Sequence, residues 1–562
     1  MIKNITGAKA VIESLMDEEV DTIFGYPGGA IMPIYDALYD YKDKVKHILV
    51  RHEQGAAHAA EGFARASGKT GVCFSTSGPG ATNLVTGIAD AMLDSVPLVC
   101  ITGQVVSHLV GTDAFQEVDI IGITTPITKW NYQITNAVEI KPVIHKAFEI
   151  AQSGHPGPVV IDITKDAQLN LFEFQKDIVK TIKQTKKVNH HHEFKTLAEL
   201  LNKAQKPLIL AGHGILISHA EEELKVLVEK TGIPVSCTLH GLTSIPVDHP
   251  NFVGLLGMHG NYAPNVLTNQ ADVILAIGMR FDDRVTSDSK KYAKQAKIIH
   301  IDIDESELDK NVKTNLSLLS DAKEVLTNLL PLVDKNQHGD WLGKFHKLYR
   351  QEYQQVISSD INRHNSTTIS MAEVIHQLSK ITEGDAIIVT DVGQHQMVTA
   401  RYFNHKYPNH FITSGGAGTM GFALPAAIGV KVARPDKAVI AIIGDGSFQM
   451  TLQELGTIMQ TNIPVKIVIL NNHYLGMVRQ WQELFFTQRY SFVDIDSPDF
   501  VALANAYNIP GKTVEKKSDL QEALQELWVS KTAYLLDIKV VKDSNIFPMI
   551  PPGAAVDEIR LA

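Results

Sequence analysis

The sequence contains little of what marks several classes of protein. It has only three cysteines, Cys73, Cys100 and Cys237, too few and too widely spaced for a disulfide framework or a cysteine-based metal site. No apolar run approaches the roughly 18 residues that a membrane-spanning helix needs, so we expect no membrane insertion. The N-terminal residues lack the apolar core of a signal peptide and the Arg- and Ser-rich composition of a transit peptide, which favours a reducing cytoplasm.

An excess of basic charge is also missing. The 52 Lys and Arg residues are outnumbered by 62 Asp and Glu, giving a net charge of −10. Because proteins that bind nucleic acids generally carry a basic surface, we expect no nucleic-acid partner. The remaining composition, 44% hydrophobic and 20% charged over 562 residues, is that of a globular chain. At roughly 150 residues per domain it predicts three or four domains.

Short apolar runs alternate with helical patterns along the whole chain. In the first 165 residues, Ala-rich helical segments separate the runs, and the first of these helices should stop at Gly68. The runs are too continuously apolar for half-exposed strands, so they predict parallel sheets covered by helices on both faces. The expected strand units are 47–50, 72–77, 97–102, 158–164, 207–214, 272–283, 297–305, 386–393, 438–446, 465–472 and 533–540.

This pattern predicts an α/β chain of three doubly wound parallel-sheet domains. We place them at residues 1–175, 194–345 and 370–562, joined by polar linkers at 176–193 and 346–369. The first linker contains three consecutive histidines, His190, His191 and His192, which are more often solvated than bound to a metal in such a setting.

Polar residues follow two expected strands of the third domain. Gly444-Asp445-Gly446-Ser447 comes directly after one strand, and Asn471-Asn472 follows the next. In an open parallel sheet, ligands bind beyond the carboxyl ends of the strands, so both segments lie at one edge. Asp and Asn oxygens suit a Mg²⁺ ion that also binds phosphate, and glycines let the backbone approach phosphate closely. The alternative is that Asp445 and Asn472 only cap helices.

The GDGS and NN pair resembles the thiamine-diphosphate signature of the pyruvate-decarboxylase-like superfamily. The resemblance implies that Asp445, Asn472 and the main chain of Tyr474 hold Mg²⁺ on the cofactor, with Gly446 and Ser447 beside it. It also implies a catalytic glutamate from the first domain, and the segment RHEQGAAHAAEGFARASG supplies Glu53. We expect Glu53 to be at least partly buried, whether it activates the cofactor or only stabilises the start of a helix.

Further segments narrow the resemblance to the FAD-containing catalytic subunits of acetohydroxyacid synthases, also called acetolactate synthases. This family decarboxylates pyruvate and joins the two-carbon unit to a second pyruvate or to 2-ketobutyrate, on the route to valine, leucine and isoleucine. The similarity spans nearly the whole chain. The matching segments are 25–38, 112–117, 164–168, 257–260, 278–286, 300–304 and 549–555.

The resemblance implies two further groups of cofactor residues. Those expected to contact thiamine diphosphate are Gly393, Gln394, His395, Gly418, Met420, Gly476 and Met477. Those expected to contact FAD are His155, Gly212, His213, Gly214, His259, Gly260, Gly278, Arg280, Asp282, Asp302, Ile303 and Asp321. His155 departs from the family pattern, which usually has an arginine before Pro-Gly-Pro.

The resemblance also implies substrate residues and partners. Arg284 should attract the carboxylate of the incoming keto acid, and Trp481 should narrow the acceptor pocket in favour of 2-ketobutyrate. Gly29, Gln116 and Lys165 match positions near the active site. We expect a homodimer with shared active sites, or a tetramer of such dimers. Because the chain reaches residue 562 with no appended effector domain, we also expect a separate small regulatory subunit.

Several alternatives remain open at this stage. Residues 416–421 have the G-x-G-x-x-G spacing of a dinucleotide-binding loop, which predicts an NAD-dependent oxidoreductase, but the expected ribose-binding acid is then Asp445 of the GDGS turn. Pyruvate oxidase and the FAD-free catabolic acetolactate synthase are the nearest rivals within the superfamily. A binding module without catalysis would leave Glu53, Asp445 and Asn472 without a shared purpose.

Overall fold

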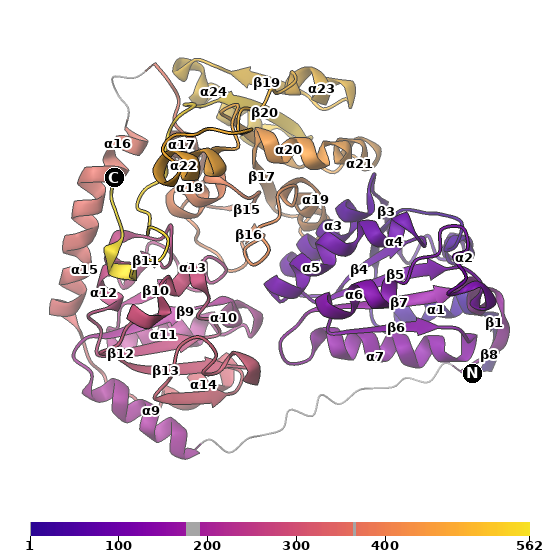
Figure 1. The fold of residues 1–562 in the computed structure, drawn as a ribbon, viewed down its shortest axis with the longest axis horizontal. Coiled ribbons are helices and arrows are strands. Elements are labelled where there is room, and N and C mark those ends of the chain that lie inside the picture. The colour runs from indigo at the N-terminus through magenta and orange to yellow at the C-terminus, as the bar shows by residue number, and fades with distance from the viewer. Residues whose placement is uncertain (1, 176–190, 363–366) are drawn as a thin grey trace.

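The structure, a computed structural model, describes residues 2–175, 191–362 and 367–562. It contains three six-stranded sheets, all of whose strands run parallel, each with helices on both faces (Figure 1). This confirms the predicted class of three doubly wound domains. Most of the predicted linker 176–193, His190 included, lies outside the described residues. Residues from the predicted second linker complete the long helix α15 (Gly339–Glu352) and continue it through a π-helical segment (Tyr353–Ile357) into α16 (Ser358–Ile361).

The first domain has the strand order β3-β2-β4-β5-β7-β6. Its strands are β2 (Thr22–Gly25), β3 (Lys46–Leu49), β4 (Gly71–Ser75), β5 (Leu98–Gln104), β6 (Trp130–Ile134) and β7 (Pro158–Thr164). Its helices are α1 (Gly7–Asp17), α2 (Met32–Tyr39), α3 (Glu53–Ser67), α4 (Pro79–Asn83), α5 (Val85–Asp94), α6 (Ile120–Thr124), α7 (Ile140–Gln152) and α8 (Lys165–Leu169). As predicted, α3 ends at Gly68, which adopts the left-handed conformation at φ 72°.

The second domain has the order β11-β10-β9-β12-β13-β14. Its strands are β9 (Pro207–Ala211), β10 (Val235–Cys237), β11 (Phe252–Leu255), β12 (Val273–Ile277), β13 (Lys297–Asp302) and β14 (Leu316–Leu319). The helices other than α15 are α9 (His191–Lys203), α10 (His213–Ile217), α11 (Glu221–Thr231), α12 (Tyr262–Thr268), α13 (Asp283–Thr286), α14 (Ala322–Leu329) and α16 (Ser358–Ile361).

The third domain has the order β16-β15-β17-β18-β20-β19. Its strands are β15 (Ala386–Thr390), β16 (Phe411–Thr413), β17 (Ala438–Gly444), β18 (Lys466–Asn471), β19 (Gly511–Val514) and β20 (Tyr534–Lys539). Its helices are α17 (Met371–Thr382), α18 (Gln394–Tyr402), α19 (Ala423–Ala433), α20 (Asp445–Thr451), α21 (Leu455–Thr461), α22 (Gly476–Phe485), α23 (Phe500–Ala506) and α24 (Leu520–Val529).

Every expected strand unit overlaps a strand of the structure, and the missed strands are short. These missed strands are β2, β6, β10, β11, β14, β16 and β19, together with a small antiparallel pair, β1 (Ile2–Thr6) and β8 (Leu171–Gln175). Runs of three to five residues do not show a clear periodicity, so hydrophobic pattern alone cannot separate them from loops. Their partners in the sheet define them.

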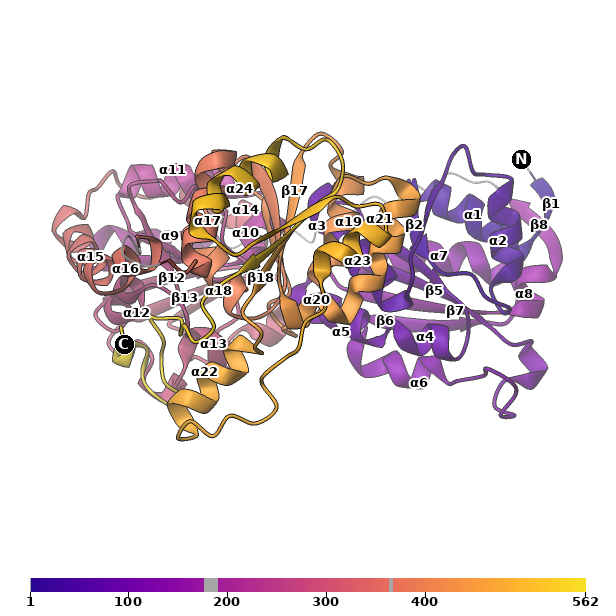
Figure 2. The ribbon, with the colours of Figure 1, turned by 90° about the horizontal axis from the view of Figure 1, so that it is seen from above.

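Helices α3 and α19 join the first and third domains by close contact (Figures 1 and 2). A Cβ atom on Gly429 would lie 1.8 Å from the carbonyl oxygen of Ala59, and one on Gly62 would lie 2.2 Å from that of Ala426. The helices can approach this closely only because both positions are glycine. The buried residues around them form one apolar cluster with members from both domains.

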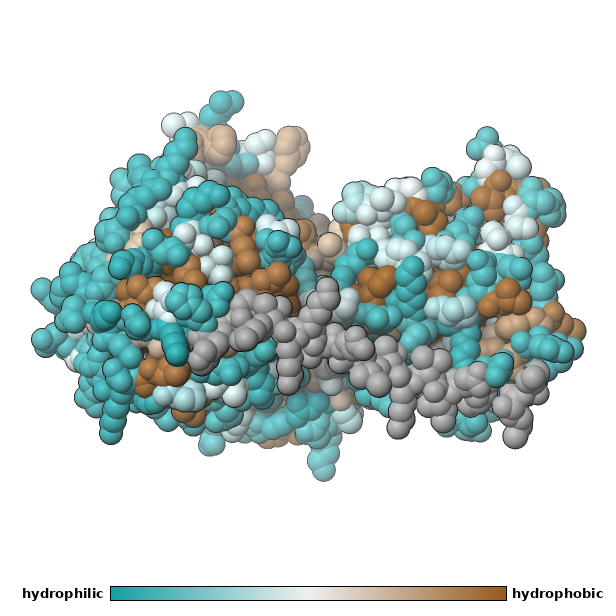
Figure 3. Space-filling model, turned by 90° about the horizontal axis from the view of Figure 1, so that it is seen from below, coloured by the Kyte–Doolittle hydropathy of each residue, from teal (hydrophilic) through white to brown (hydrophobic). Residues whose placement is uncertain are grey.

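The C-terminal segment connects the third domain to the second. Ile550, Val556 and Ile559 are buried in the apolar cluster of the second domain, and the main chain of Ile550 donates a hydrogen bond to the carbonyl of Met258. Seen from below, the surface is mainly hydrophilic and deeply indented between the first domain and the other two (Figure 3). Among the described helices, none combines the length and apolar character needed to cross a membrane.

We expect Gly429→Ala to destabilise the contact between the first and third domains. The added methyl group collides with the backbone of α3, and such overpacking typically costs about 1–3 kcal/mol. Gly343→Ala is the control, because Gly343 is an exposed helical residue with no atom within 4 Å of the added Cβ. It should be neutral or stabilising by up to about 1 kcal/mol. Urea unfolding measures both, and equal stability of the two variants would contradict the tight contact.

Candidate active site

Glu53 lies at the carboxyl edge of the first sheet, as predicted. It begins α3 just beyond β3, and only 8% of it is exposed. Its Oε2 accepts a hydrogen bond of 2.9 Å from the Asn83 amide, and a Cβ on Gly80 would lie 3.0 Å from Oε1. The carboxylate is therefore buried, positioned by one amide, and favoured by the N-terminal end of the α3 dipole.

Three other predicted residues belong to the same edge. Gly29 follows β2 and faces open space, Gln116 lies against Gly78, and Lys165 begins α8 directly after β7. Gln116 adopts a left-handed conformation, at φ 59°. Since the carboxyl ends of parallel strands share one edge, the first domain gathers its four predicted residues there.

The equivalent edge of the third domain collects three helix starts. Helix α18 begins after Gly393, α20 begins at Asp445 after β17, and α22 begins at Gly476. A Cβ on Gly476 would lie 2.3 Å from Oε1 of Gln394 and 2.9 Å from Nδ2 of Asn472, so a larger residue here would displace the side chains of this turn. Free N–H groups at helix starts attract anions, and the arrangement fits a diphosphate.

Asp445 and Asn472 lie together at this edge. Burial raises the pKa of Asp445, while the Ser497 hydroxyl, the His473 ring and the main-chain N–H of Asn472 act in the opposite direction. The Ser497 hydroxyl donates to Asp445 Oδ2 at 3.1 Å, and Asn472 Oδ1 accepts from the main chain of Tyr474 at 3.1 Å. A buried carboxylate beside an amide oxygen is a donor set that fits Mg²⁺.

The other predicted residues of this turn surround these two. The Ser447 hydroxyl donates to the carbonyl of Val392 at 3.4 Å, and a Cβ on Gly446 would lie 3.9 Å from the methyl carbon of Met420. His395 is buried, its Nε2 has no hydrogen-bond partner in the described chain, and burial lowers its pKa to about 3. A neutral ring with an unpaired nitrogen is therefore available to a ligand at this turn.

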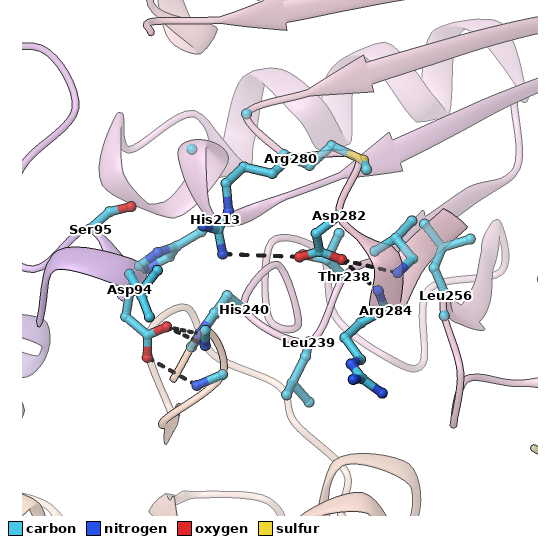
Figure 4. A pocket seen from close by; sticks show the side chains of 18 of the residues that line it. Asp94, Ser95, His213, Thr238, Leu239, His240, Leu256, Arg280, Asp282 and Arg284 are labelled. Atoms are coloured by element: carbon cyan, nitrogen blue, oxygen red, sulfur yellow. Dashed lines mark hydrogen bonds and ion pairs between the residues drawn. The ribbon is translucent and has the colours of Figure 1, made fainter. Parts of the chain in front are cut away.

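A cavity of about 690 Å³ opens between the second and third domains, with one wall from the first domain (Figure 4). Its size suits a cofactor. The residues predicted for FAD that line it are His155, His213, Gly214, His259, Gly278, Arg280, Asp282, Asp302, Ile303 and Asp321. Gly212 and Gly260 do not line it. Both pack against backbone, because a Cβ on either would lie within 2.5 Å of a carbonyl oxygen.

The three carboxylates predicted to bind FAD differ in the hydrogen bonds that they accept from the chain. Oδ1 of Asp282 accepts from the main chain of Arg284 and Val285, and so caps α13; Oδ1 of Asp321 caps α14 in the same way. Burial raises the pKa of Asp302 to about 6, although the main chain of Asp304 donates to it. Each of the three carboxylates keeps a second oxygen that could accept from ribose hydroxyls, so the residues present fit FAD.

Histidines occupy the end of the cavity next to the first domain. His155 hydrogen-bonds Ser95 and lies 3.6 Å from Asp304, and burial lowers its pKa. His213 is half-buried, its ring stacks on that of His240 with the ring centroids 5.3 Å apart, and desolvation lowers its pKa well below the usual range. These neutral rings can contact a flat ligand but supply little positive charge. His240 was missed by sequence reasoning, because an isolated histidine after a short strand gives no signal.

The two residues predicted to select substrate also line the cavity, as do Met477 and Gly418. Arg284 comes from the second domain, with 62% of its side chain exposed, and its guanidinium lies 3.3 Å from Asp283 and donates to the sulfur of Met258. Trp481 comes from α22 of the third domain and packs against Phe485. The structure thus brings an exposed guanidinium group and a large aromatic ring from two domains to one cavity.

The chain does not join all the predicted residues in one place. Among the described residues that line the cavity, none belongs to the edge with Glu53, Gly29, Gln116 and Lys165. Cavity residues that sequence reasoning missed include the segment Ser414–Ala417, and Asp94 and Ser95 of the first domain, whereas Gln396 and Met397 belong to the turn expected to contact the diphosphate and line the cavity as well. For the segment Ser414–Ala417, the sequence signal was the G-x-G-x-x-G spacing that begins at Gly416.

Profiles of known families match all three domains. "Thiamine pyrophosphate enzyme, N-terminal TPP binding domain" matches residues 5–123, the central domain of the same enzymes matches 194–329, and their C-terminal TPP binding domain matches 391–538.

Curated relatives are similar over their full lengths. The chain is 45% identical to acetolactate synthase isozyme 2 large subunit of Escherichia coli strain K12, covering 99% of both chains. It is 47% identical to a probable acetolactate synthase large subunit of Methanocaldococcus jannaschii, covering 98% of this chain and 95% of the relative. It is 45% identical to acetolactate synthase large subunit of Lactococcus lactis, over 99% of this chain and 96% of the relative.

We expect Asp302→Asn to stabilise the cofactor-free chain at pH 8, by about 2 kcal/mol in the free energy of unfolding. Burial raises the pKa of Asp302 to about 6 in the folded chain, so its ionised form costs stability above that pH. The gain should therefore shrink as the pH falls through about 6 and vanish below about 4, the ordinary pKa of aspartate.

Urea unfolding at pH 8 and pH 5 measures this difference. Asp304→Asn serves as the control, because the Ser306 hydrogen bonds and His155 hold the pKa of Asp304 below its usual value against the effect of burial. That variant should lose stability at pH 8. A stability of Asp302→Asn below that of the unaltered chain at pH 8 would contradict the assignment.

Proposed function

The chain belongs to the family of acetolactate synthase large subunits, and from this premise we propose that the site described above makes acetolactate with thiamine diphosphate. Pyruvate loses carbon dioxide, and the remaining two-carbon unit is joined to a second pyruvate or to 2-ketobutyrate. The observation that carries this proposal is the presence of two sheet edges with complementary chemistry, one with the buried Glu53 and the other with the buried Asp445 and Asn472. A dehydrogenase would need neither the buried Glu53 nor the Asp445 and Asn472 pair.

Thiamine diphosphate, when bound, supplies the nucleophilic carbon and the electron sink for decarboxylation. The turns after Gly393 and before Gly476 would hold its diphosphate, and Asp445, Asn472 and the main chain of Tyr474 would hold Mg²⁺ there. Glu53 would hold a proton at its carboxylate, which the Asn83 amide orients. Met420, next to Gly446, would limit the shape that a ligand can take at this turn.

We infer that active sites form between two copies of the chain. The side-chain hydrogen bonds given for Glu53 and Asp445 go to Asn83 and Ser497 and do not join the two edges, so Glu53 of the partner subunit would complete the site at the Asp445 edge. Phe115, beside Gln116, has 87% of its surface exposed, and Phe492 of the third domain has 99%. Exposed aromatic rings at both edges support their burial in a dimer, or in a tetramer built from dimers. A small regulatory subunit is the expected further partner of a large subunit.

FAD would occupy the cavity between the second and third domains and undergo no net oxidation or reduction. The hydroxyl groups of FAD would donate hydrogen bonds to Asp302, Asp282 and Asp321. The main chain of the glycine turns would contact the cofactor. Pyruvate oxidase, the rival within the superfamily, is not supported by the full-length similarity to acetolactate synthases.

At the other end of the cavity Arg284 would attract the carboxylate of the acceptor keto acid, and Trp481 would contact the alkyl group of that acid.

The direct test is acetolactate formation from pyruvate by the purified protein, with and without thiamine diphosphate, Mg²⁺ and FAD. We expect product only when thiamine diphosphate and Mg²⁺ are present, with the bound flavin remaining oxidised. Peroxide formed in proportion to pyruvate consumed would show a pyruvate oxidase instead. Consumption of NADH would show a dehydrogenase.

We expect Glu53→Gln to reduce the rate of acetolactate formation about 10²–10⁴-fold, the range typical of an acid–base group. The amide keeps the hydrogen-bonding shape but cannot hold or release the proton. Glu61→Gln is the matched control on the same helix: burial raises the pKa of Glu61 well above its usual value, so it is already neutral. That variant should stay within a few fold. Equal activity of the two variants would exclude the proton-transfer role.

We expect Trp481→Leu to lower the preference for 2-ketobutyrate over pyruvate by about tenfold, the scale of a lost apolar contact with one methylene. Product ratios in mixtures of the two acceptors measure this preference. Phe485→Leu is the control, because Phe485 packs against Trp481 but does not line the cavity. An unchanged product ratio in Trp481→Leu would assign acceptor selection to another residue.

A further inference from the structure

Asp94, the last residue of α5, contacts all three domains with one buried carboxylate. Its Oδ1 lies 2.9 Å from Nε2 of His240, in the second domain, and accepts from the main chain of Gly416, in the third, at 2.6 Å. Its Oδ2 accepts from the main chain of Gly415 at 3.0 Å and from Arg65 of its own domain at 3.2 Å. Figure 4 shows Asp94 pointing toward His240 at the wall of the cavity.

Gly415 and Gly416 must be glycine for this contact to form. A Cβ on Gly416 would lie 2.9 Å from Oδ1 of Asp94 and 2.7 Å from the Cβ of Leu93, and one on Gly415 would lie 2.2 Å from the His240 ring. Two consecutive main-chain N–H groups thus surround one carboxylate, as such pairs do in anion-binding turns. The segment that begins the G-x-G-x-x-G spacing binds a protein carboxylate here, and not a nucleotide phosphate.

The segment Ser414–Gly421 connects this contact to the site. At its start, the Arg65 guanidinium donates to the carbonyl of Thr413, and at its end the main chain of Gly421 donates to Asp391. Between these points Gly418 lines the cavity, and Met420 lies beside Gly446 of the Asp445 turn. A displacement of the segment at Asp94 would therefore move residues at both the cavity and the diphosphate turn.

We propose that Asp94 is a positioning residue for catalysis: it fixes the segment Ser414–Gly421 between the cavity and the diphosphate turn, and so ties the three domains into one site. The catalytic part of this proposal rests on the proposed function; the positioning of the segment does not. Although burial alone would raise it, the charges of His240 and Arg65 hold the pKa of Asp94 well below its usual range. The carboxylate is ionised at any pH at which the enzyme would work.

Asp90, one helical turn earlier on α5, provides a matched control. Its Oδ1 accepts from the Ser414 hydroxyl at 2.6 Å, so it contacts the same segment from the same helix. Burial raises the pKa of Asp90 to about 8, so Asp90 is neutral at pH 7, where Asp94 is charged. An amide can replace a neutral carboxylic acid at little cost, but at Asp94 it removes the charge that binds two main-chain N–H groups and the Arg65 guanidinium.

The test compares Asp94→Asn, Gly416→Ala and Asp90→Asn by hydrogen exchange and by kinetics. In Asp94→Asn we expect faster amide exchange confined to peptides that cover residues 411–421, and acetolactate formation reduced about tenfold or more, as for loss of hydrogen bonds to a charged group. Gly416→Ala keeps the carboxylate but pushes the segment away, so it should show the same local exchange. Asp90→Asn should stay within about threefold in rate, with exchange unchanged.

The binding of FAD, followed by flavin fluorescence, is a third measurement. We expect Asp94→Asn and Gly416→Ala to weaken it and Asp90→Asn to leave it near the original value. Unchanged exchange over 411–421 in Asp94→Asn, or a loss of protection spread over all three domains, would overturn the positioning role. Faster local exchange with unchanged kinetics would overturn its link to catalysis. If the unaltered protein makes no acetolactate, the proposed function fails while the exchange result still decides the positioning of the segment.

Discussion

The site depends on the way parallel strands align their carboxyl ends. In each of the three sheets every strand ends at the same edge, and the chain leaves that edge in a turn that carries polar residues or glycine. One such edge presents Glu53 and another presents Asp445 and Asn472. A single sheet could not surround a cofactor of this size, so function depends on how the edges are brought together.

Buried carboxylates make the contacts between the domains specific. Glu454, from the third domain, accepts hydrogen bonds from the main chain of Arg51 and His52, immediately before Glu53. Asp94 contacts the second and third domains from the first. A carboxylate that accepts several N–H groups tolerates burial because these bonds replace the water it has lost. Apolar contact between α3 and α19 brings the domains together, and these polar contacts fix their relative position.

The net charge of −10 contrasts with the proposed cofactors and substrates, all of which are anionic. Attraction must therefore be local. The helix starts at Gly393, Asp445 and Gly476 present free N–H groups, and a Mg²⁺ ion on Asp445 and Asn472 would add positive charge. In the cavity, Arg280 and Arg284 are the cationic side chains among the lining residues. Charge at a few turns, and not the average of the surface, determines what this chain binds.

The sequence by itself determined the fold class, the long buried strands and the turns that carry chemistry. Buried strands and glycine turns are specified by residues that are neighbours along the chain, so a short stretch of sequence is enough to predict them. Only the tertiary structure decided which turns lie close together. Arg284 and Trp481 line one cavity and Glu53 does not, and the main-chain N–H groups of Gly415 and Gly416 donate to Asp94. These contacts join residues hundreds of positions apart, and their geometry follows from the packing of whole domains, which no local pattern encodes.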